Sequence, residues 1–284
     1  MEMQPVTTGS LSDIMLANIE VHTRMVEQYN NEPHFRPENQ AKVRRVLEDL
    51  AKRTGGGRML DVGCGTGFVI HLAKDLFARI DGVDVTPAML AKIDTSSGNI
   101  TLHNQPAESL PFAAGSFDAV TSYAFLHHLE DYVKVLREAH RVLRPGGMLY
   151  VDLEPNREFW RLMTELERSE RAGERFSDIV QREIKAVLHT DEQVSRDFGI
   201  DEETFNKAEY TKAVLGGIDA QLFARQCREI GFSECQVVPQ WFLGQGTVMH
   251  GQSFEAAAVI EDYLVRVQPL SLGLFKYLRF LVRK

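Results

Sequence analysis

The feature that most constrains the fold is a short apolar run that leads directly into a glycine-rich turn. Residues 59–62 are hydrophobic apart from Asp61, and Gly63, Gly65 and Gly67 then follow in a Gly-x-Gly-x-Gly pattern. Glycine has no Cβ atom and tolerates positive φ angles, so such a turn lets the backbone bend tightly and approach a ligand closely. We therefore expect a strand, a ligand-binding turn and a helix in this order.

Short apolar runs alternate with helical patterns between residues 58 and 154. The expected strands are bounded by Gly, Pro, Asn or Asp and cover residues 59–62, 80–85, 100–103, 117–125 and 148–154. Helical spacing lies between them, at residues 68–77, 86–94 and 129–144. Strands that alternate with helices predict an α/β fold with a doubly wound, Rossmann-like and mostly parallel sheet.

The rest of the chain predicts three further regions around this core of residues 58–154. Residues 1–57 are expected to form an N-terminal helical lead-in, and the charge-dense residues 155–217 an inserted helical cap. Residues 218–284 are expected to close the core with a helix, strands and a helical insertion. The end of that region alternates apolar and basic side chains, which favours a final strand over a basic amphipathic helix on a membrane surface.

Composition and charge exclude several classes of protein. The chain is 44% hydrophobic and 25% charged, as soluble globular domains are, and its net charge of −8 offers nucleic acid no general attraction. No apolar run reaches the roughly 20 residues that cross a bilayer, and no signal-peptide pattern opens the chain. The three cysteines form no CxxC pair. We expect a cytoplasmic protein with reduced thiols, no transmembrane segment and no metal site.

An acidic residue lies where a nucleotide site needs one. Asp84 ends the second expected strand, 21 residues after Gly63, where a carboxylate can accept hydrogen bonds from ribose hydroxyls. A dinucleotide site would place its third glycine one residue later than Gly67, and Asp61 would repel a pyrophosphate. The pattern therefore favours a ligand with an ammonium and a sulfonium. An NAD-dependent oxidoreductase is the less favoured alternative.

Five segments in this order resemble the class I S-adenosylmethionine-dependent methyltransferases, in the small-molecule, methyltransferase type 11-like branch. The segments are residues 61–67, 82–86, 107–118, 126–129 and 143–149. The resemblance is close over residues 58–154 and loose over the closing strands. It implies a Rossmann-like methyltransferase with S-adenosylmethionine as cofactor and S-adenosylhomocysteine as product.

The resemblance also implies which residues bind the cofactor. They are Gly63, Cys64 and Gly65 along the methionine part, Asp61 at its amino group, Asp84 at the ribose, Val85 and Ala107 at the adenine, and Ser122 and Tyr123 on the floor of the site. Many relatives have an aspartate where this chain has Pro106, so Glu108 becomes the candidate for the adenine amino group. Tyr29 either folds over the cofactor or is an ordinary core tyrosine.

Methyl transfer needs the acceptor in line with the S–CH₃ bond, so positioning alone can supply much of the catalysis. A base is needed only if the acceptor is a hydroxyl, an ammonium or a carbon acid. His127 and His128 are the candidate bases, although each could instead be a structural histidine. Asp152 and Glu154 are expected to be solvated or to cap a helix.

We expect a small organic acceptor and no nucleic acid. A non-catalytic, cofactor-binding partner or regulatory protein is the main alternative, and the oligomeric state stays open.

Overall fold

The computed structural model describes residues 12–31 and 35–284, so residues 1–11 and 32–34 of the predicted lead-in lie outside the described residues. The described lead-in contains α1 (Asp13–Met25), the short 3₁₀ helix η2 (Tyr29–Asn31) and α2 (Pro37–Thr54). Pro37 opens α2, where proline fits the first helical turn. Gly55 ends it with a φ of 84°, a conformation that glycine adopts without strain.

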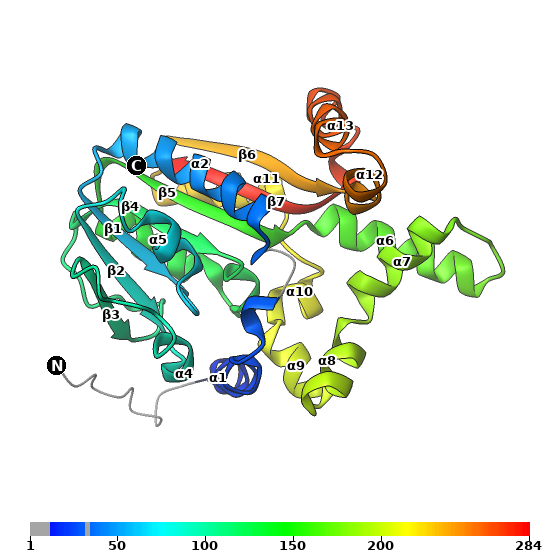
Figure 1. The fold of residues 1–284 in the computed structure, drawn as a ribbon, viewed down its shortest axis with the longest axis horizontal. Coiled ribbons are helices and arrows are strands. Elements are labelled where there is room, and N and C mark those ends of the chain that lie inside the picture. Colours follow the sequence, from blue (N-terminus) through cyan, green and yellow to red (C-terminus); the bar gives the residue numbers. More distant parts are fainter. Residues whose placement is uncertain (1–11, 32–34) are drawn as a thin grey trace.

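The described residues form one seven-stranded sheet, which confirms the predicted α/β class (Figure 1). Its strands are β1 (Arg58–Val62), β2 (Arg79–Asp84), β3 (Ile100–Asn104), β4 (Phe117–Tyr123), β5 (Leu143–Pro155), β6 (Glu234–Phe242) and β7 (Phe275–Arg283). The spatial order is β3-β2-β1-β4-β5-β7-β6. The first five strands are parallel, and β7 runs antiparallel to both β5 and β6. Residues 275–283 are thus a strand and not an amphipathic helix.

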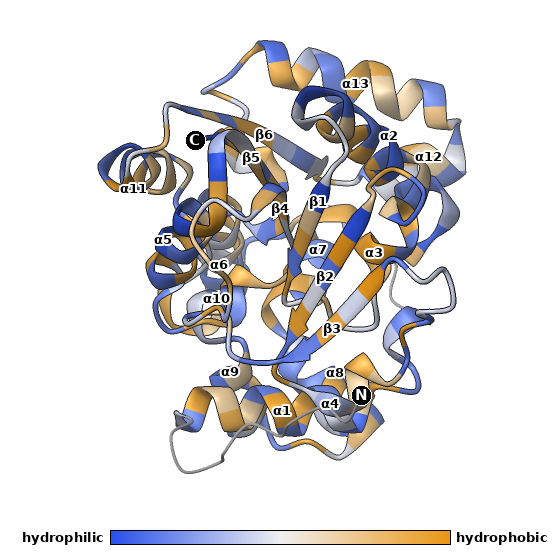
Figure 2. Ribbon diagram, turned by 90° about the vertical axis from the view of Figure 1, so that its left-hand side faces the viewer, coloured by the Kyte–Doolittle hydropathy of each residue, from blue (hydrophilic) through white to orange (hydrophobic). Residues whose placement is uncertain are grey.

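Figure 2 shows helices on both faces of the sheet. The central strands bury hydrophobic side chains on both of these faces. Leu60 and Val62 of β1 pack toward α5 (Tyr132–Val142) and α11 (Ala220–Ile230). Met59 of the same strand packs toward α2 and α3 (Phe68–Ala73). Successive residues of a strand point to opposite faces, so this short run contributes to both halves of the core.

Several element boundaries differ from the expectation: the helices expected over residues 68–77 and 129–144 are shorter, and the fifth strand begins at Leu143 and not at residue 148. The fourth strand ends at Tyr123 and not at residue 125, because Ala124 has a φ of 51° and turns the chain out of the sheet. The helix expected over residues 86–94 is the single turn α4 (Pro87–Leu90). The division of the chain into four regions stays a prediction, since the one sheet takes strands from two of them.

The order of the strands reverses between β1 and β4, and this places a crevice at their carboxyl ends. In open α/β sheets, ligands bind outside the carboxyl ends of the strands at such a reversal. The glycine turn follows β1 directly, and Ala124 and the 3₁₀ helix η4 (Leu126–His128) follow β4. The most informative sequence motif therefore lies at the topological position where ligands bind.

The segment between β5 and α11 consists of helices that reach back to this crevice. They are α6 (Arg157–Arg171), α7 (Asp178–Leu188), α8 (Thr190–Phe198), α9 (Glu202–Ala208) and α10 (Tyr210–Leu215). Figure 1 shows α6 and α7 projecting away from the sheet, while α8 and α9 return beside α1. A hydrophobic cluster joins them, with Val21 of α1 against Phe205 of α9.

The segment between β6 and β7 forms a second excursion, with α12 (Gln245–Gly251), α13 (Phe254–Arg266) and the 3₁₀ helix η5 (Leu272–Leu274). None of the helices within residues 12–31 and 35–284 combines the length and the apolar character needed to span a membrane.

Candidate functional site

The glycine turn is held by hydrogen bonds from its own backbone to the second strand. The amides of Gly63 and Cys64 both donate to the carbonyl of Val83, at 2.9 and 3.0 Å. Gly63 has a φ of 67°, and a Cβ atom built on it would lie 2.2 Å from the ring of Phe125. Only glycine fits this position, because any side chain would both strain the backbone and collide with the ring.

Asp84 ends β2 with both carboxylate oxygens fixed by the backbone. Its Oδ2 accepts from the amide of Gly65 at 2.9 Å, and its Oδ1 accepts from the amide of Thr86 at 2.8 Å. Burial raises the pKa of Asp84, and these two amides oppose that effect. Each oxygen keeps a second lone pair, so the fixed carboxylate can accept hydrogen bonds from two hydroxyls of a ligand.

Asp61 is a buried carboxylic group beneath the turn. Its Oδ1 accepts a 2.6 Å hydrogen bond from the hydroxyl of Thr121. Burial raises the pKa of Asp61 to about 7, and the charge of Asp84 acts in the same direction. A nearby cation would favour the ionised form, so this group is suited to bind an ammonium.

Two adjoining cavities occupy the crevice. The larger measures about 320 Å³, a size suited to a small molecule, and it meets a smaller one along Tyr29, Gly63, Gly65 and Ala124. Four acidic residues line the larger cavity against one lysine, Lys134; they are Asp84, Glu108, Glu130 and Asp131. This excess of negative charge favours a cationic ligand and disfavours a pyrophosphate.

Most of the residues assigned from the sequence come together here. Those that line the two cavities are Tyr29, Asp61, Gly63, Cys64, Gly65, Asp84, Val85, Ala107, Glu108, Tyr123 and His128. The other two, Ser122 and His127, are buried but line neither of these cavities. The binding roles of all these residues stay predictions.

Glu108 offers an acceptor that the described residues do not use. Its Oε2 atom is buried and has no hydrogen-bond partner among them, although the residue lines the larger cavity. A buried polar atom is normally hydrogen-bonded, so an unpartnered one beside a cavity indicates a group that a ligand would satisfy.

Glu154 anchors the turn that carries both histidines. Its side chain is fully buried, and it accepts from the amides of Phe125, Leu126 and His127 at 2.9 to 3.1 Å. It also bonds Nδ1 of His127 at 2.9 Å. Glu154 thus caps η4, one of the two roles expected for it. Asp152 is buried against Arg279, at 2.7 Å, and is not solvated.

His128 is the histidine that reaches the larger cavity. Its Nδ1 lies 2.8 Å from the carbonyl oxygen of Ala208, which can only accept, so Nδ1 donates and Nε2 has the lone pair of the neutral ring. Burial lowers the pKa of His128 well below its ordinary value. Its ring also meets that of His22 edge to face, with centroids 5.0 Å apart. His128 is therefore a neutral group with a basic nitrogen.

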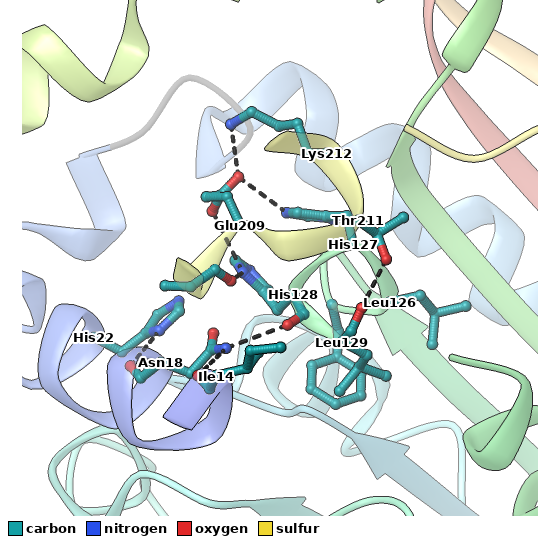
Figure 3. A network of polar contacts seen from close by, with 12 residues as sticks. Ile14, Asn18, His22, Leu126, His127, His128, Leu129, Glu209, Thr211 and Lys212 are labelled. Carbon is teal, nitrogen blue, oxygen red and sulfur yellow. Dashed lines mark hydrogen bonds and ion pairs between the residues drawn. The ribbon is translucent and has the colours of Figure 1, made fainter. Parts of the chain in front are cut away.

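Two elements outside the core hold His128 in place, as Figure 3 shows. From α1, the side-chain amide of Asn18 donates to the His128 carbonyl at 3.3 Å. From α10, the hydroxyl of Thr211 donates to the Leu129 carbonyl at 2.7 Å. The candidate base thus lies between the lead-in helix and the inserted helices.

His127, His128 and Glu209 bring potential metal-ligand atoms within 4.8 Å of one another. Two of these groups already have other partners: Lys212 Nζ lies 2.6 Å from Glu209 Oε2, and Nδ1 of His128 donates to the Ala208 carbonyl. Among the described residues, these contacts make the cluster an ion-paired hydrogen-bond network. Sequence reasoning missed Glu209 and Lys212, which lie in a segment with no local motif.

The part of the chain that contains the glycine turn resembles known proteins. Residues 60–151 match the family model described as "Methyltransferase domain". A ubiquinone/menaquinone biosynthesis C-methyltransferase of Geobacter sp. (strain M21) is 41% identical over 106 residues, which cover 34% of this chain and 45% of the relative. A demethylmenaquinone methyltransferase of Chlorobaculum parvum is 39% identical over 99 residues, covering 34% and 41%. The chain thus spans less than half the length of these curated relatives.

Solved structures share the fold at low sequence identity. The [4+2]-cyclase SpnF has a TM-score of 0.53 and 17% identity, over 100% of this chain and 99% of that one. An S-adenosylmethionine-dependent methyltransferase from Mesorhizobium loti has a TM-score of 0.51 and 17% identity, over 84% and 96%. Residues 60–151 thus match a methyltransferase domain, and the strand order and the acidic cavity at the glycine turn are consistent with that match.

Proposed function

We propose that this protein transfers a methyl group from S-adenosylmethionine to a small organic acceptor. The observation that supports this most is the pair of carboxyl groups beside the glycine turn, Asp61 and Asp84, at the edge of an acidic cavity. S-adenosylmethionine supplies an electrophilic methyl group on a positively charged sulfur. An acidic site attracts such a cation, whereas it would repel the pyrophosphate of NAD.

The lining residues divide naturally along such a cofactor. Asp61 binds the amino group, Asp84 accepts from the ribose hydroxyls, and the Oε2 atom of Glu108 accepts from the adenine amino group. Val85 and Ala107 provide the apolar wall and a backbone amide beside the adenine. Tyr29 lines both cavities and covers the junction between the two ends of the cofactor.

On the acceptor side, His128 acts as the general base. Its ring is neutral, and Nε2 can take a proton from a hydroxyl or from an acidic carbon. Two relatives are named for methylation in quinone biosynthesis, and a reduced quinone has ionisable hydroxyls beside the carbon to be methylated. A hydroxylated ring is therefore the acceptor class to test first.

The test is transfer of radiolabelled methyl from S-adenosylmethionine to a panel of acceptors that begins with demethylmenaquinol. We expect labelled product with the unmodified protein and a loss of about 100-fold or more in His128→Gln, the usual scale of general-base catalysis. S-adenosylhomocysteine affinity should persist in that variant. His250→Gln, an exposed histidine on α12, is the matched control.

The alternatives predict different outcomes. Tight binding of S-adenosylhomocysteine without transfer to any acceptor would indicate a non-catalytic partner or regulatory protein. Binding of NAD in its place would indicate an oxidoreductase.

A further inference from the structure

A buried carboxylate from the inserted helices lies against the candidate base. Glu209 is the single residue between α9 and α10 and is only 8% exposed. Its Oε1 lies 3.3 Å from Nδ1 of His128, and its Oε2 lies 3.8 Å from Nε2 of His127 (Figure 3). Burying a carboxylate costs free energy unless partners compensate, so these contacts need an explanation.

Glu209 is ionised in this position. Burial opposes its ionisation, but the ammonium of Lys212 holds the pKa of Glu209 far below its usual range. The charged or titratable groups around it come from four elements: His127 and His128 on η4, Lys212 on α10, Glu154 on β5 and His22 on α1. The carboxylate is therefore a fixed negative charge beside the His128 ring.

His128 needs such a charge in order to act as a base. Burial lowers the pKa of His128, because an imidazolium ion is poorly solvated there, and the charge of Glu209 opposes this effect. The other carboxylate of the network, Glu154, is bonded to Nδ1 of His127. Among the residues that the structure describes, Glu209 is the carboxylate that contacts the His128 ring.

We propose that Glu209 is a positioning residue for the His128 base, an inference that rests on the methyl transfer proposed above. With the Ala208 carbonyl it keeps the proton of the neutral ring on Nδ1, and its charge stabilises the imidazolium that forms when Nε2 takes a proton. In that step the O–H or C–H bond of the acceptor breaks, an N–H bond forms at Nε2, and the electron pair stays on the acceptor. The aspartate of a Ser-His-Asp triad has the same two tasks.

This assignment gives the inserted helices a chemical role. Glu209 is 81 residues from His128 in the sequence and reaches it only because α9 packs on α1 and α10 packs on η4. Glu209 contacts His128 only when the inserted helices pack on the core.

The test measures the protonation of His128 directly. Protein with ¹⁵N-labelled histidine is titrated by NMR with S-adenosylhomocysteine bound, and the His128 signals are assigned from their absence in His128→Gln. In Glu209→Gln, which keeps the shape of the side chain, we expect the pKa of His128 to fall by at least one unit. Such a fall corresponds to a proton affinity at least tenfold lower.

Two further variants separate this role from general effects. Glu203→Gln removes an exposed carboxylate of α9 that pairs with Lys207, and it should leave the titration unchanged. Glu209→Asp keeps the charge and should restore at least part of the shift, a rescue that a purely structural role would not give. If Glu209→Gln fails to fold, Glu209→Ala takes its place with the same expected fall. An unchanged His128 titration in the variant without the charge, Glu209→Gln or its replacement Glu209→Ala, would overturn the proposal.

The same samples distinguish this proposal from the proposed function. If S-adenosylhomocysteine fails to bind the unmodified protein, the methyl transfer proposal fails, whatever the titration without ligand shows. If it binds and the titration of Glu209→Gln is unchanged, the role of Glu209 fails alone.

Discussion

The proposed cofactor side and the proposed acceptor side of the cavity are built in different ways. On the cofactor side, the glycine turn and Asp84 come from adjacent βα segments, and backbone amides hold them. On the acceptor side, His22, His128 and Glu209 come from three separate parts of the chain and meet only through packing between helices. Local sequence is therefore enough to build the first side, whereas the second depends on the tertiary fold.

The electrostatics differ in the same way. On the cofactor side, Asp61 and Asp84 are buried, and none of the residues that the structure describes forms an ion pair with them, which suits a positively charged ligand. The acceptor side pairs its carboxylate with Lys212 and keeps His128 neutral. In the proposed function, the first side binds a positive charge and the second side accepts a proton.

The largest expected effect is on stability and concerns Glu154, which anchors the turn that carries both histidines. Glu154→Ala should lower the free energy of unfolding by about 3–5 kcal/mol, because it leaves two buried amides, a partly buried amide and the His127 ring without their acceptor. Chemical denaturation measures this loss. The exposed Glu203→Ala is the control and should stay within about 0.5 kcal/mol. An equally small loss in Glu154→Ala would show that η4 does not depend on this anchor.

The next effect is confined to the cofactor side. Asp84→Ala should weaken S-adenosylhomocysteine binding by roughly 1.5–3 kcal/mol, or about 10- to 150-fold, since hydrogen bonds to charged groups contribute this much. Calorimetry measures the affinity, and Asp94→Ala, an exposed aspartate beyond α4, is the matched control. Equal affinities in the two variants would remove Asp84 from the site.

The pH dependence of binding tests Asp61. Because its pKa is about 7, the group is largely protonated at pH 6 and half ionised at pH 7. Only the ionised form attracts an ammonium, so affinity for S-adenosylhomocysteine should rise roughly fivefold from pH 6 to pH 7. Asp61→Asn should bind more weakly at pH 7 and lose this rise. If the rise persists in Asp61→Asn, another group causes it.

The smallest effect concerns α1, which helps to close the acceptor side. Ser12 caps this helix by accepting from the amide of Met15 at 3.3 Å. Ser12→Ala should cost about 0.5–1 kcal/mol locally and speed hydrogen exchange in α1 by about two- to fivefold. Ser253→Ala removes the corresponding cap of α13 and should affect that helix alone. Unchanged exchange in α1 would mean that packing on α9 alone fixes the helix.

The sequence predicted much of the fold because its signals are local. Strand periodicity gave the five parallel strands, and the glycines with Asp84 gave the place of the ligand cavity. The early end of β4 was missed because the positive φ of Ala124 has no sequence signal: nothing in an alanine predicts that conformation. The position of the Phe125 ring against Gly63 was also missed, because it follows from the turn at Ala124.

The acceptor side was predictable only in part. The two histidines after the fourth strand were evident, but which one reaches the cavity depends on how Glu154 and Ala208 orient the rings. Glu209 could not be found among the many charged residues of the insertion, because its burial follows from contacts between segments far apart in the chain.

The most direct test of the central claim, that the crevice is an S-adenosylmethionine site, is thermal unfolding with S-adenosylmethionine, S-adenosylhomocysteine and NAD side by side. A ligand that binds only the folded protein stabilises it by about 2.7 kcal/mol at one hundred times its dissociation constant. We predict a higher melting temperature with the first two ligands and no change with NAD. A rise with NAD alone would contradict the account.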